Sequence, residues 1–413
     1  MATTNTGSGS SATLATRLKQ VYADGITSII PNSTELMKRL KFRKELELGK
    51  EAVFDVQLSH EHGFTVGQGE LTLNAAVAQI AANAKVDGYQ VILRSRVSYD
   101  LISRAKTSKT AFARFNDSKF IPMVESFQKR QEIYAIYGRD GLGKVLSNTS
   151  GALVITVDTW APSLWLGTEG LILEAFDAKT ATANQHNGDL TVSSIAISTR
   201  TVTVTGTNSS VVANDHLYYK GDRTTTAHNA PVGLMTIARN TGMLYNISAT
   251  TYALWAANAY DAGTSGLTLA KVLAAAAMSA DKGCDEKLTC LAPVSCFQSL
   301  VSDQAALRKY DASYSKAKVE NGAESIIFYG ATGAIEIVPY MYMKQGEAVL
   351  FPERFTYLIG SSEMVNQVGP GGDIVFDLES TSAKEMRLFA EWTVFCERPG
   401  WITYITRSDA GVL

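Results

Sequence analysis

Residues 51–74 read EAVFDVQLSHEHGFTVGQGELTLN, and this stretch decides the fold class that we infer. A run of β-branched and aromatic residues around Phe54 precedes a polar segment that contains Gly67 and Gly69, and a second apolar run starts at Leu71. Two such runs separated by polar, glycine-containing residues predict an extended β-hairpin. With a rise of ~3.3 Å per residue, its arms would extend over several tens of ångströms.

The predicted hairpin needs a packing partner, because an isolated two-stranded ribbon is only marginally stable in water. We expect that partner to be another chain, with glycines at positions 63, 67 and 69 letting the ribbon change its angle. A β-rich run over residues 89–93 and a series of basic residues follow the hairpin. A solvated face or inter-subunit salt bridges explain those basic residues better than a phosphate-binding strip, which stays open. The candidate inter-subunit contacts are Phe54, Phe64, Gly67, Gly69, Lys85, Arg94 and Arg96.

A long amphipathic helix is predicted over residues 118–138. Residues 116–118 supply N-capping side chains, Pro122 suits the first turn, and Gly138 is a natural stop. Apolar residues recur every three to four positions, as expected for a helix with one buried face. The residues on that face are Val124, Phe127, Tyr134 and Tyr137. The residues expected on the polar face are Glu125, Lys129, Arg130 and Glu132.

Residues 163–222 are rich in Thr, Val, Gly, Asn and Ser, which marks a shift in composition. Turn signals at 187–188 and at 206–208 separate short strand-like runs. Short strands at this spacing predict a small β-barrel or sandwich insertion. The predicted strands cover Leu171–Ala175, Leu190–Ile197, Thr201–Val204 and His216–Tyr219.

Helix and strand signals alternate after the insertion, and together with the hairpin they predict an α+β fold. Strand-rich segments extend over 347–359 and 385–406. The other predicted elements are a helix over 267–280, a buried strand over 288–294, a helix from Ser295 to Leu307 and a hairpin over 325–340.

Composition limits the classes of protein that this chain can belong to. Its 413 residues are 46% hydrophobic and 19% charged, which suffices for a large packed core and excludes global disorder. The formal net charge of -2 gives no overall basic footprint for nucleic acid, although contact through a local patch stays open. No stretch reaches the ~18 continuous apolar residues of a membrane span, and the first residues do not resemble a secretory leader. We therefore expect a soluble chain.

No motif predicts a catalytic, cofactor-binding or metal-binding residue. Residues 138–145 nearly match a phosphate-binding loop, but Val145 lacks the hydroxyl that would bind magnesium, and a helix rather than a strand precedes them. His60 and His62 flank a glutamate, a pattern that a polar loop tip explains better than a metal site. The four cysteines lack paired zinc spacing and are expected to be buried free thiols, and Trp255 is expected in the core.

The order of these elements resembles the Hong Kong 97-type capsid fold of tailed phages, and most of all the capsid proteins of N4-like podoviruses. The strand over 288–294 with the helix that follows it, and the segment 326–337, resemble the axial domain of that family. The resemblance implies an α+β capsid fold with a β-rich insertion domain. Its parts would be an N-terminal arm (1–50), an extended loop (51–95), a peripheral domain (96–160) with a spine helix (118–138), an insertion domain (163–225), an axial domain (226–384) and a return strand to the peripheral domain (385–413).

The resemblance implies a major capsid protein that self-assembles into hexamers and pentamers of an icosahedral shell around phage double-stranded DNA, and not an enzyme. It implies no cofactor, assembly in the host cytoplasm, a location in the virion and non-specific contact with packaged DNA. Portal, scaffold and decoration proteins are further expected partners, and a membrane is not. Two alternatives stay open: another virion structural protein such as a tail or decoration subunit, and a carbohydrate-active enzyme with a β-barrel domain.

Overall fold

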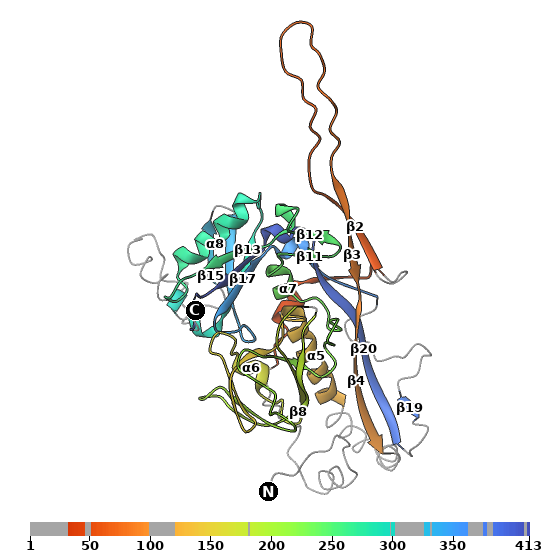
Figure 1. Ribbon diagram of the computed structural model, residues 1–413, viewed down its shortest axis with the longest axis vertical. Coiled ribbons are helices and arrows are strands. Elements are labelled where there is room, and N and C mark those ends of the chain that lie inside the picture. The colour runs from red at the N-terminus through yellow and green to blue at the C-terminus, as the bar shows by residue number, and fades with distance from the viewer. Residues whose placement is uncertain are drawn as a thin grey trace, which may run out of the picture. The chain divides into compact units, whose positions relative to one another are not determined.

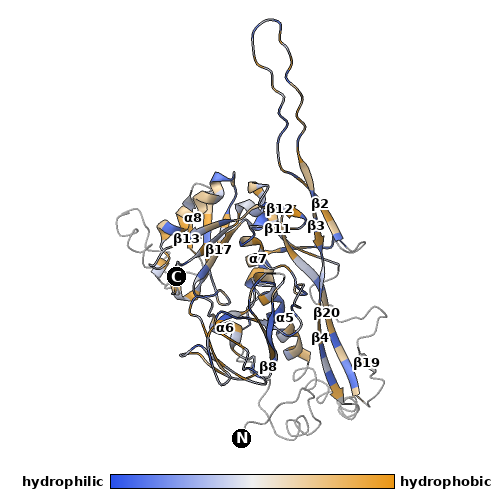
Figure 2. Ribbon diagram, viewed as in Figure 1, coloured by the Kyte–Doolittle hydropathy of each residue, from blue (hydrophilic) through white to orange (hydrophobic). Residues whose placement is uncertain are grey.

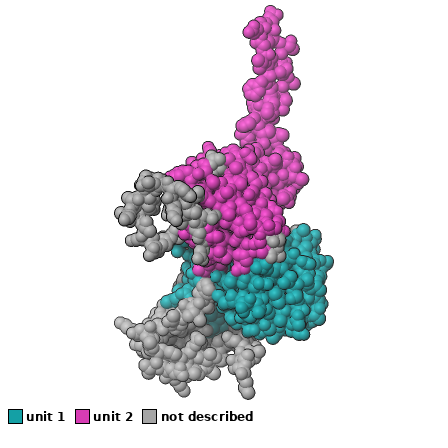
Figure 3. Space-filling model, turned by 90° about the vertical axis from the view of Figure 1, so that its left-hand side faces the viewer, with its two compact units in different colours: residues 1–39, 89–233, 360–392 teal, residues 40–88, 234–359, 393–413 magenta. Residues whose placement is uncertain are grey.

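The computed structural model divides the chain into two compact units (Figure 3). Unit 1 comprises residues 1–39, 89–233 and 360–392, and unit 2 comprises residues 40–88, 234–359 and 393–413. Most of the expected N-terminal arm and the predicted N-cap residues 116–118 lie outside the described residues. The described residues are 32–45, 51–98, 120–180, 182–297, 299–301, 326–330, 333–361, 375–377, 383–408 and 411–413.

Six strands of unit 1 form a closed barrel in the order β10-β5-β6-β9-β8-β7. Burial alternates along β9, where Val202 and Val204 are buried while Thr201 and Thr203 are half-buried. Because the barrel is closed, none of its strands leaves an unpaired edge. The strands are β5 (Gly143–Thr149), β6 (Ala152–Ile155), β7 (Ile172–Phe176), β8 (Gln185–Ala196), β9 (Thr201–Thr205) and β10 (His216–Tyr219).

The barrel differs from the expected insertion in two respects. It begins at Gly143 rather than at 163, because β5 and β6, expected in the 96–160 peripheral domain, complete its wall. The turn predicted at 187–188 is wrong: both residues lie inside β8. The pairing of β7 with β8 shifts register around Asn187, and Asp189 has a positive φ of 57°. A bulge thus takes up the turn-forming residues without ending the strand.

The predicted long helix is α5 (Ile121–Ile136), with Pro122 in its first turn. Gly138 follows it with φ 47°, as expected for a residue that ends a helix. The expected polar face is wrong for Lys129 and Glu132, which are both buried. The carboxylate of Glu132 accepts hydrogen bonds from the backbone N–H groups of the first turn of α2 (Glu35–Arg39), at 2.7 and 3.1 Å. Polar side chains can be buried when they are paired in this way.

Lys129 has a different partner in unit 1. Its Nζ donates a 2.7 Å hydrogen bond to the carbonyl of Leu166, just after the short helix α6 (Pro162–Trp165). Burial lowers the pKa of Lys129 to about 8. The polar residues of α5 therefore do not mark a solvent-exposed face, since Lys129 and Glu132 connect α5 to its neighbours.

A long antiparallel pair completes unit 1. Strand β4 (Tyr89–Ser98) pairs with β20 (Ala383–Cys396) at ten successive positions, and β19 (Val375–Asp377) pairs with β20 on its other side. Both β4 and β20 carry hydrophobic as well as hydrophilic stretches (Figure 2). The last residues of β20, from Thr393 on, belong to unit 2.

Unit 2 is built on a six-stranded mixed sheet in the order β13-β21-β17-β14-β16-β15. Helix α8 (Leu269–Asp281) packs against it through Val272, Ala275 and Ala276, and its N-cap is Thr268, as a helix start favours. The strands are β13 (Asn258–Asp261), β14 (Leu288–Pro293), β15 (Ile326–Gly330), β16 (Gly333–Tyr340), β17 (Glu347–Phe351) and β21 (Thr403–Thr406).

Most sequence predictions for this unit are confirmed. The strand predicted at 288–294 is β14, which is buried along its whole length. The hairpin predicted over 325–340 is the antiparallel pair β15–β16. A helix begins at residue 294, close to the predicted Ser295, but most of its predicted length lies outside the described residues. All four cysteines are buried and free, and Trp255 is a core residue.

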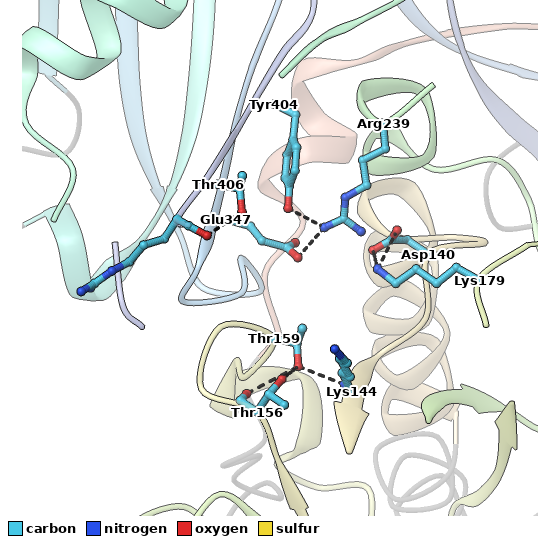
Figure 4. Close-up of polar contacts among 10 residues, drawn as sticks. Asp140, Lys144, Thr156, Thr159, Lys179, Arg239, Glu347, Tyr404 and Thr406 are labelled. Carbon is cyan, nitrogen blue, oxygen red and sulfur yellow. Dashed lines mark hydrogen bonds and ion pairs between the residues drawn. The ribbon is translucent and has the colours of Figure 1, made fainter. Parts of the chain in front are cut away.

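The remaining elements of unit 2 are short. Strand β1 (Lys41–Arg43) pairs in parallel with β18 (Thr356–Gly360). A partly buried ion pair joins Arg239, directly after α7 (Leu234–Ala238), to Glu347 of β17, and Arg239 also donates to the Tyr404 hydroxyl at 2.7 Å (Figure 4). The other short elements are β11 (Met243–Leu244), β12 (Ile247–Ser248), η2 (Ala253–Trp255), η4 (Glu353–Phe355) and η5 (Pro399–Trp401).

Within the described ranges, no helix combines the length and the hydropathy that a membrane crossing requires.

Candidate interaction surface

The predicted hairpin is present in unit 2 as the pair β2 (Glu51–Gln57) and β3 (Ala81–Asp87), joined by the loop 58–80 (Figure 1). We call residues 51–87 the ribbon. Its register runs from Glu51 opposite Asp87 to Gln57 opposite Ala81. The prediction of a second strand at Leu71 is wrong, because the partner strand begins only at Ala81. The sequence of β3 is AANAKVD, which has one β-branched residue and no aromatic residue, so it carries almost no strand signal.

The loop of the ribbon continues as two facing extended segments. His62 and Val77 exchange backbone hydrogen bonds of 2.9 and 2.7 Å. Closer to the tip, the Asn74 side chain donates a 2.7 Å hydrogen bond to the Phe64 carbonyl, and the Asn74 backbone N–H donates to the Thr65 hydroxyl at 2.9 Å. These contacts define the course of the loop, but they bury almost none of its side chains.

Apolar side chains are exposed along the ribbon. Phe64 and Leu73 each have 82% of their surface exposed, and Val66 has 93%. Single exposed apolar residues are common, but a contiguous series of them marks an interaction site. The large hydrophobic residues exposed on the ribbon are Val53, Phe64, Val66, Leu71, Leu73, Val77 and Ile80.

The base of the ribbon is anchored in unit 2 by three aromatic rings. Phe54 of β2 stacks on Phe395 with ring centroids 4.6 Å apart, and Tyr245 meets the same Phe395 edge-on at 5.3 Å. The Tyr245 carbonyl accepts a 3.0 Å hydrogen bond from the backbone of Lys85, and its hydroxyl donates to the Val394 carbonyl. Tyr245 and Asn246 form the turn between β11 and β12, and both have the positive φ of a primed hairpin turn.

The seven predicted contact residues do not form one site. Phe54 is a packing residue of its own chain, and Lys85 forms an ion pair with Glu51 at 3.2 Å. Phe64, Gly67 and Gly69 lie in the exposed loop of the ribbon. The last two residues, Arg94 and Arg96, belong to β4 in unit 1 rather than to the ribbon.

The predicted glycine hinge positions differ from one another. Gly69 has φ 86° and open space around its Cα, so it forms the turn at the loop tip. A side chain at Gly67 would meet only the flexible end of Leu71, whereas one at Gly63 would meet backbone atoms of the facing segment, 3.3 Å from the Cα of Ala76. Of these three positions, only position 69 has a backbone conformation, with positive φ, that favours glycine. The hinge role itself stays a prediction.

A second surface feature lies on the β4–β20 pair of unit 1. Residues directly opposite each other in an antiparallel pair share one face. On the exposed face of β4, Arg94 lies opposite Arg387, and Arg96 lies opposite Glu385. Ile92, 53% exposed, lies opposite Phe389 on the same face. This face is therefore both apolar and basic.

The described part of the chain gives little support to a metal site or to a reactive cysteine. It contains no group of three or more His, Cys, Asp and Glu residues that could hold a metal ion. His60 and His62 are exposed in the loop of the ribbon, in agreement with a polar loop. Burial raises the pKa of the thiols of Cys290, Cys296 and Cys396, which makes them poor nucleophiles.

A buried polar cluster in unit 1 links α5 to the end of the barrel. The Tyr134 hydroxyl donates a 2.6 Å hydrogen bond to Oδ1 of Asp222, and the Arg130 guanidinium lies 3.1 Å from the ring centroid of Tyr219. Burial raises the pKa of Asp222 to about 7, although the Arg130 charge and the Tyr134 hydrogen bond act to lower it. Because the polar groups of this cluster find their partners within unit 1, we interpret it as structural.

Asp222→Asn should alter the pH dependence of unfolding. The pKa of Asp222 is higher in the folded chain than its ordinary 3.8, so its contribution to stability is complete below pH ~4 and is lost as the pH rises to about 7. The introduced amide cannot ionise, so the variant should gain stability relative to the natural chain over that interval, by up to about 4 kcal/mol. Denaturant unfolding of both proteins at pH 4, 5.5 and 7 measures the difference. A difference that stays constant would contradict this.

The fold is that of a phage capsid chain. The chain is similar to a chain of the cyanophage A-1(L) capsid asymmetric unit, with a TM-score of 0.54 and 11% identity over 95% of this chain and 97% of that one. It also matches the capsid of Myoviridae phage XM1 (TM-score 0.47, 8% identity, 95% and 98% covered) and the capsid of a native GTA particle (0.48, 6%, 95% and 95%). No family model and no curated protein matches the sequence.

Proposed function

We propose that the chain is the major capsid protein of a tailed phage. In this proposal it self-assembles into the hexamers and pentamers of an icosahedral shell that encloses double-stranded DNA, in a structural and not a catalytic role. Support comes from the capsid fold, which covers nearly all of this chain and of the cyanophage chain. The observation that carries the proposal is the ribbon, which exposes apolar residues that its own chain leaves unburied.

Energetic arguments favour burial of the ribbon on a neighbouring copy. Full burial of one large apolar side chain stabilises by about 1.5–3 kcal/mol, so the seven exposed ones together can contribute on the order of 10 kcal/mol. The loss of translational and rotational freedom on association costs an estimated ~4–15 kcal/mol. Each copy in a ring both gives and receives one such contact, because head-to-tail interfaces repeat until they close.

The finer features are part of the same proposal. The fold would be of the Hong Kong 97 type, related to N4-like podovirus capsid proteins, with α5 as the spine helix and unit 2 supplying the extended loop and the axial sheet. The barrel of unit 1 would be the insertion domain, a site for decoration proteins. Portal and scaffold proteins are further partners, DNA contact is non-specific, and the chain is located in the virion after assembly in the host cytoplasm.

Negative-stain electron microscopy of the purified chain tests the proposed function. Closed shells, or rings of five or six subunits, are the expected result at tens of micromolar protein. A chain that stays monomeric at that concentration, with or without salt, and that shows hydrolase activity on polysaccharides would overturn the proposal and favour the carbohydrate-active alternative.

A further inference from the structure

Two neighbouring chain segments join the barrel of unit 1 to the remainder of the chain. The entering segment, 137–142, connects α5 to β5, and the leaving segment, 220–233, follows β10. The two segments meet in an isolated backbone bridge between Gly138 and Val232. A Cβ atom at Gly233 would lie 2.7 Å from the backbone of the entering segment, so the two backbones touch there. We call residues 137–142 and 220–233 the neck.

A chain of three polar side chains joins α5 to the neck. The Arg130 guanidinium donates a 3.4 Å hydrogen bond to the Tyr134 hydroxyl, which in turn donates to Oδ1 of Asp222 at 2.6 Å. Tyr134 also meets Tyr219 of β10 edge-on, with ring centroids 5.9 Å apart. The backbone carbonyl of Asp222 accepts hydrogen bonds from the N–H groups of residues 229 and 230, at 2.7 and 2.9 Å. Asp222 therefore contacts α5 with its side chain and orders the leaving segment with its backbone.

The buried carboxyl of Asp222 faces one cation and one anion. The cation is Arg130 of α5, and the anion is Glu174 of β7. Burial raises the pKa of the three phenols that also face the carboxyl, so they stay neutral near pH 7. These phenols belong to Tyr134, Tyr218 and Tyr219. A protonated carboxyl keeps its hydrogen bond with the Tyr134 hydroxyl at little cost, whereas an ionised carboxylate at this buried position is destabilised by its loss of water.

We propose that the neck is a proton-sensitive joint, in which the protonated side chain of Asp222 holds the barrel on α5 and the ionised side chain releases it. On release the Tyr134–Asp222 hydrogen bond breaks and water reaches the carboxylate, while the barrel and α5 stay folded. Burial raises the pKa of Asp222 from 3.8 to about 7, so the joint is closed at low pH and opens as the pH rises to about 7. The inference goes beyond the proposed function, because it concerns contacts within unit 1 alone.

Two other groups of this region titrate, and their effects can be separated from that of Asp222. Burial lowers the pKa of Lys129 in α5 to about 8, so this side chain is still mostly charged at pH 7. Burial and the charges of Arg223 and Arg139 lower the pKa of His228 in the neck to about 4. Protonation of His228 would open the neck at acid pH, which is the opposite dependence. Comparison with Asp222→Asn cancels both contributions, because both groups are present in each protein.

Thiol labelling of the full chain, measured at each cysteine by mass spectrometry, tests the joint. Ile133 of α5 is buried and lines the contact with the neck together with Leu142 and Asp222. In the variant Ile133→Cys, the introduced thiol reacts with iodoacetamide only when this contact opens. Cys290 of β14 is fully buried and reacts only when unit 2 unfolds, so it is an internal control. Val202→Cys, at a fully buried position of β9, reports unfolding of the barrel in the same way.

The expected result is a pH-dependent difference that requires Asp222. Between pH 5 and pH 7, the labelling rate of Ile133→Cys should rise roughly fiftyfold relative to that of the double variant Ile133→Cys with Asp222→Asn, as the two pKa values of Asp222 require when opening exposes it to water. The ionisation of the thiol itself cancels in this ratio. Leu142→Cys, on the neck side of the same contact, should give the same ratio. Val202→Cys should stay as unreactive as Cys290 at both pH values.

Three results would overturn the inference. A ratio that does not change with pH would show that ionisation of Asp222 does not open the neck. Labelling of Ile133→Cys and Leu142→Cys no faster than that of Cys290 would show that the contact opens only when the chain unfolds. Labelling of Val202→Cys as fast as that of Ile133→Cys would show that the barrel unfolds rather than leaves α5.

Discussion

Replacing residues 60–79 by Asn-Gly should abolish shell and ring formation while leaving the rest of the chain folded. Asn-Gly forms a two-residue hairpin turn, which can close the ribbon between Ser59 and Ile80, where the Ser59 backbone N–H already donates to the Ile80 carbonyl at 3.2 Å. The deletion removes five of the seven large exposed apolar residues of the ribbon. At about 1.5 kcal/mol each, their loss weakens every contact by roughly 7 kcal/mol, which is about a 10⁵-fold change in affinity.

The deletion keeps the aromatic anchor at the base of the ribbon. Phe54, Tyr245 and Phe395 stay in place, so the thermal unfolding temperature should change by no more than a few degrees. Size-exclusion chromatography with light scattering measures the assembly state, and circular dichroism follows unfolding. Shells of normal size from the shortened chain would show that the ribbon is not the main assembly element.

Gly138→Ala should destabilise unit 1 far more than Gly283→Ala destabilises unit 2. Both glycines follow helices and have positive φ, 47° and 85°. A left-handed conformation costs a non-glycine residue roughly 1–2 kcal/mol, and this cost applies to both variants. At Gly138 a Cβ atom would also overlap the Pro231 carbonyl and would lie 2.6 Å from the backbone nitrogen of Gly233, whereas at Gly283 nothing lies within 4 Å.

The overlap at Gly138 involves backbone atoms on both sides, which cannot move as a flexible side chain can. We expect a loss of more than about 3 kcal/mol for Gly138→Ala, in the range of the most disruptive single substitutions. Denaturant unfolding at about 25 °C of the two variants and the natural chain measures both losses under identical conditions. Equal losses in the two variants would mean that the turn after α5 can adjust, and that conformation alone sets the cost.

Local signals were sufficient to predict many elements. His216–Tyr219 is predicted and observed as β10, and Pro122 and Gly138 bracket α5 as expected. The run at 288–294 is short and apolar, and it specifies the buried strand β14. These successes share a cause: each rests on residues whose preferences act within a few positions of the chain.

The wrong predictions have a non-local cause, because contacts between residues distant in the sequence decide these structures. The strand β3 has few strand-forming residues and is ordered by pairing with β2 and by a hydrogen bond from Lys85 to Tyr245, which is distant in the sequence. Lys129 and Glu132 can be buried because they pair with backbone groups distant in the sequence. Lys129 donates a hydrogen bond to a backbone carbonyl, and Glu132 accepts one from a backbone N–H. Arg387 could not be placed opposite Arg94, since the two strands that pair them lie far apart along the chain. Tertiary contacts override local preference in each case.

The candidate interaction surface was predicted only in part. The ribbon and its exposed loop follow from the sequence of residues 51–74, and so do Phe64, Gly67 and Gly69. The role of Phe54 as an anchor could not be inferred, because Phe395 lies in a strand far along the chain. The turn at Tyr245 and Asn246 is also hard to predict from the sequence, because tyrosine rarely takes a positive φ.

A cryo-electron microscopy reconstruction of particles assembled from the natural chain tests the central claim most directly. Density for residues 58–80 should run across the neighbouring subunit, with Phe64, Val66 and Leu73 buried in the contact. Particles in which the ribbon contacts only its own chain, or extends into solvent, would contradict the account.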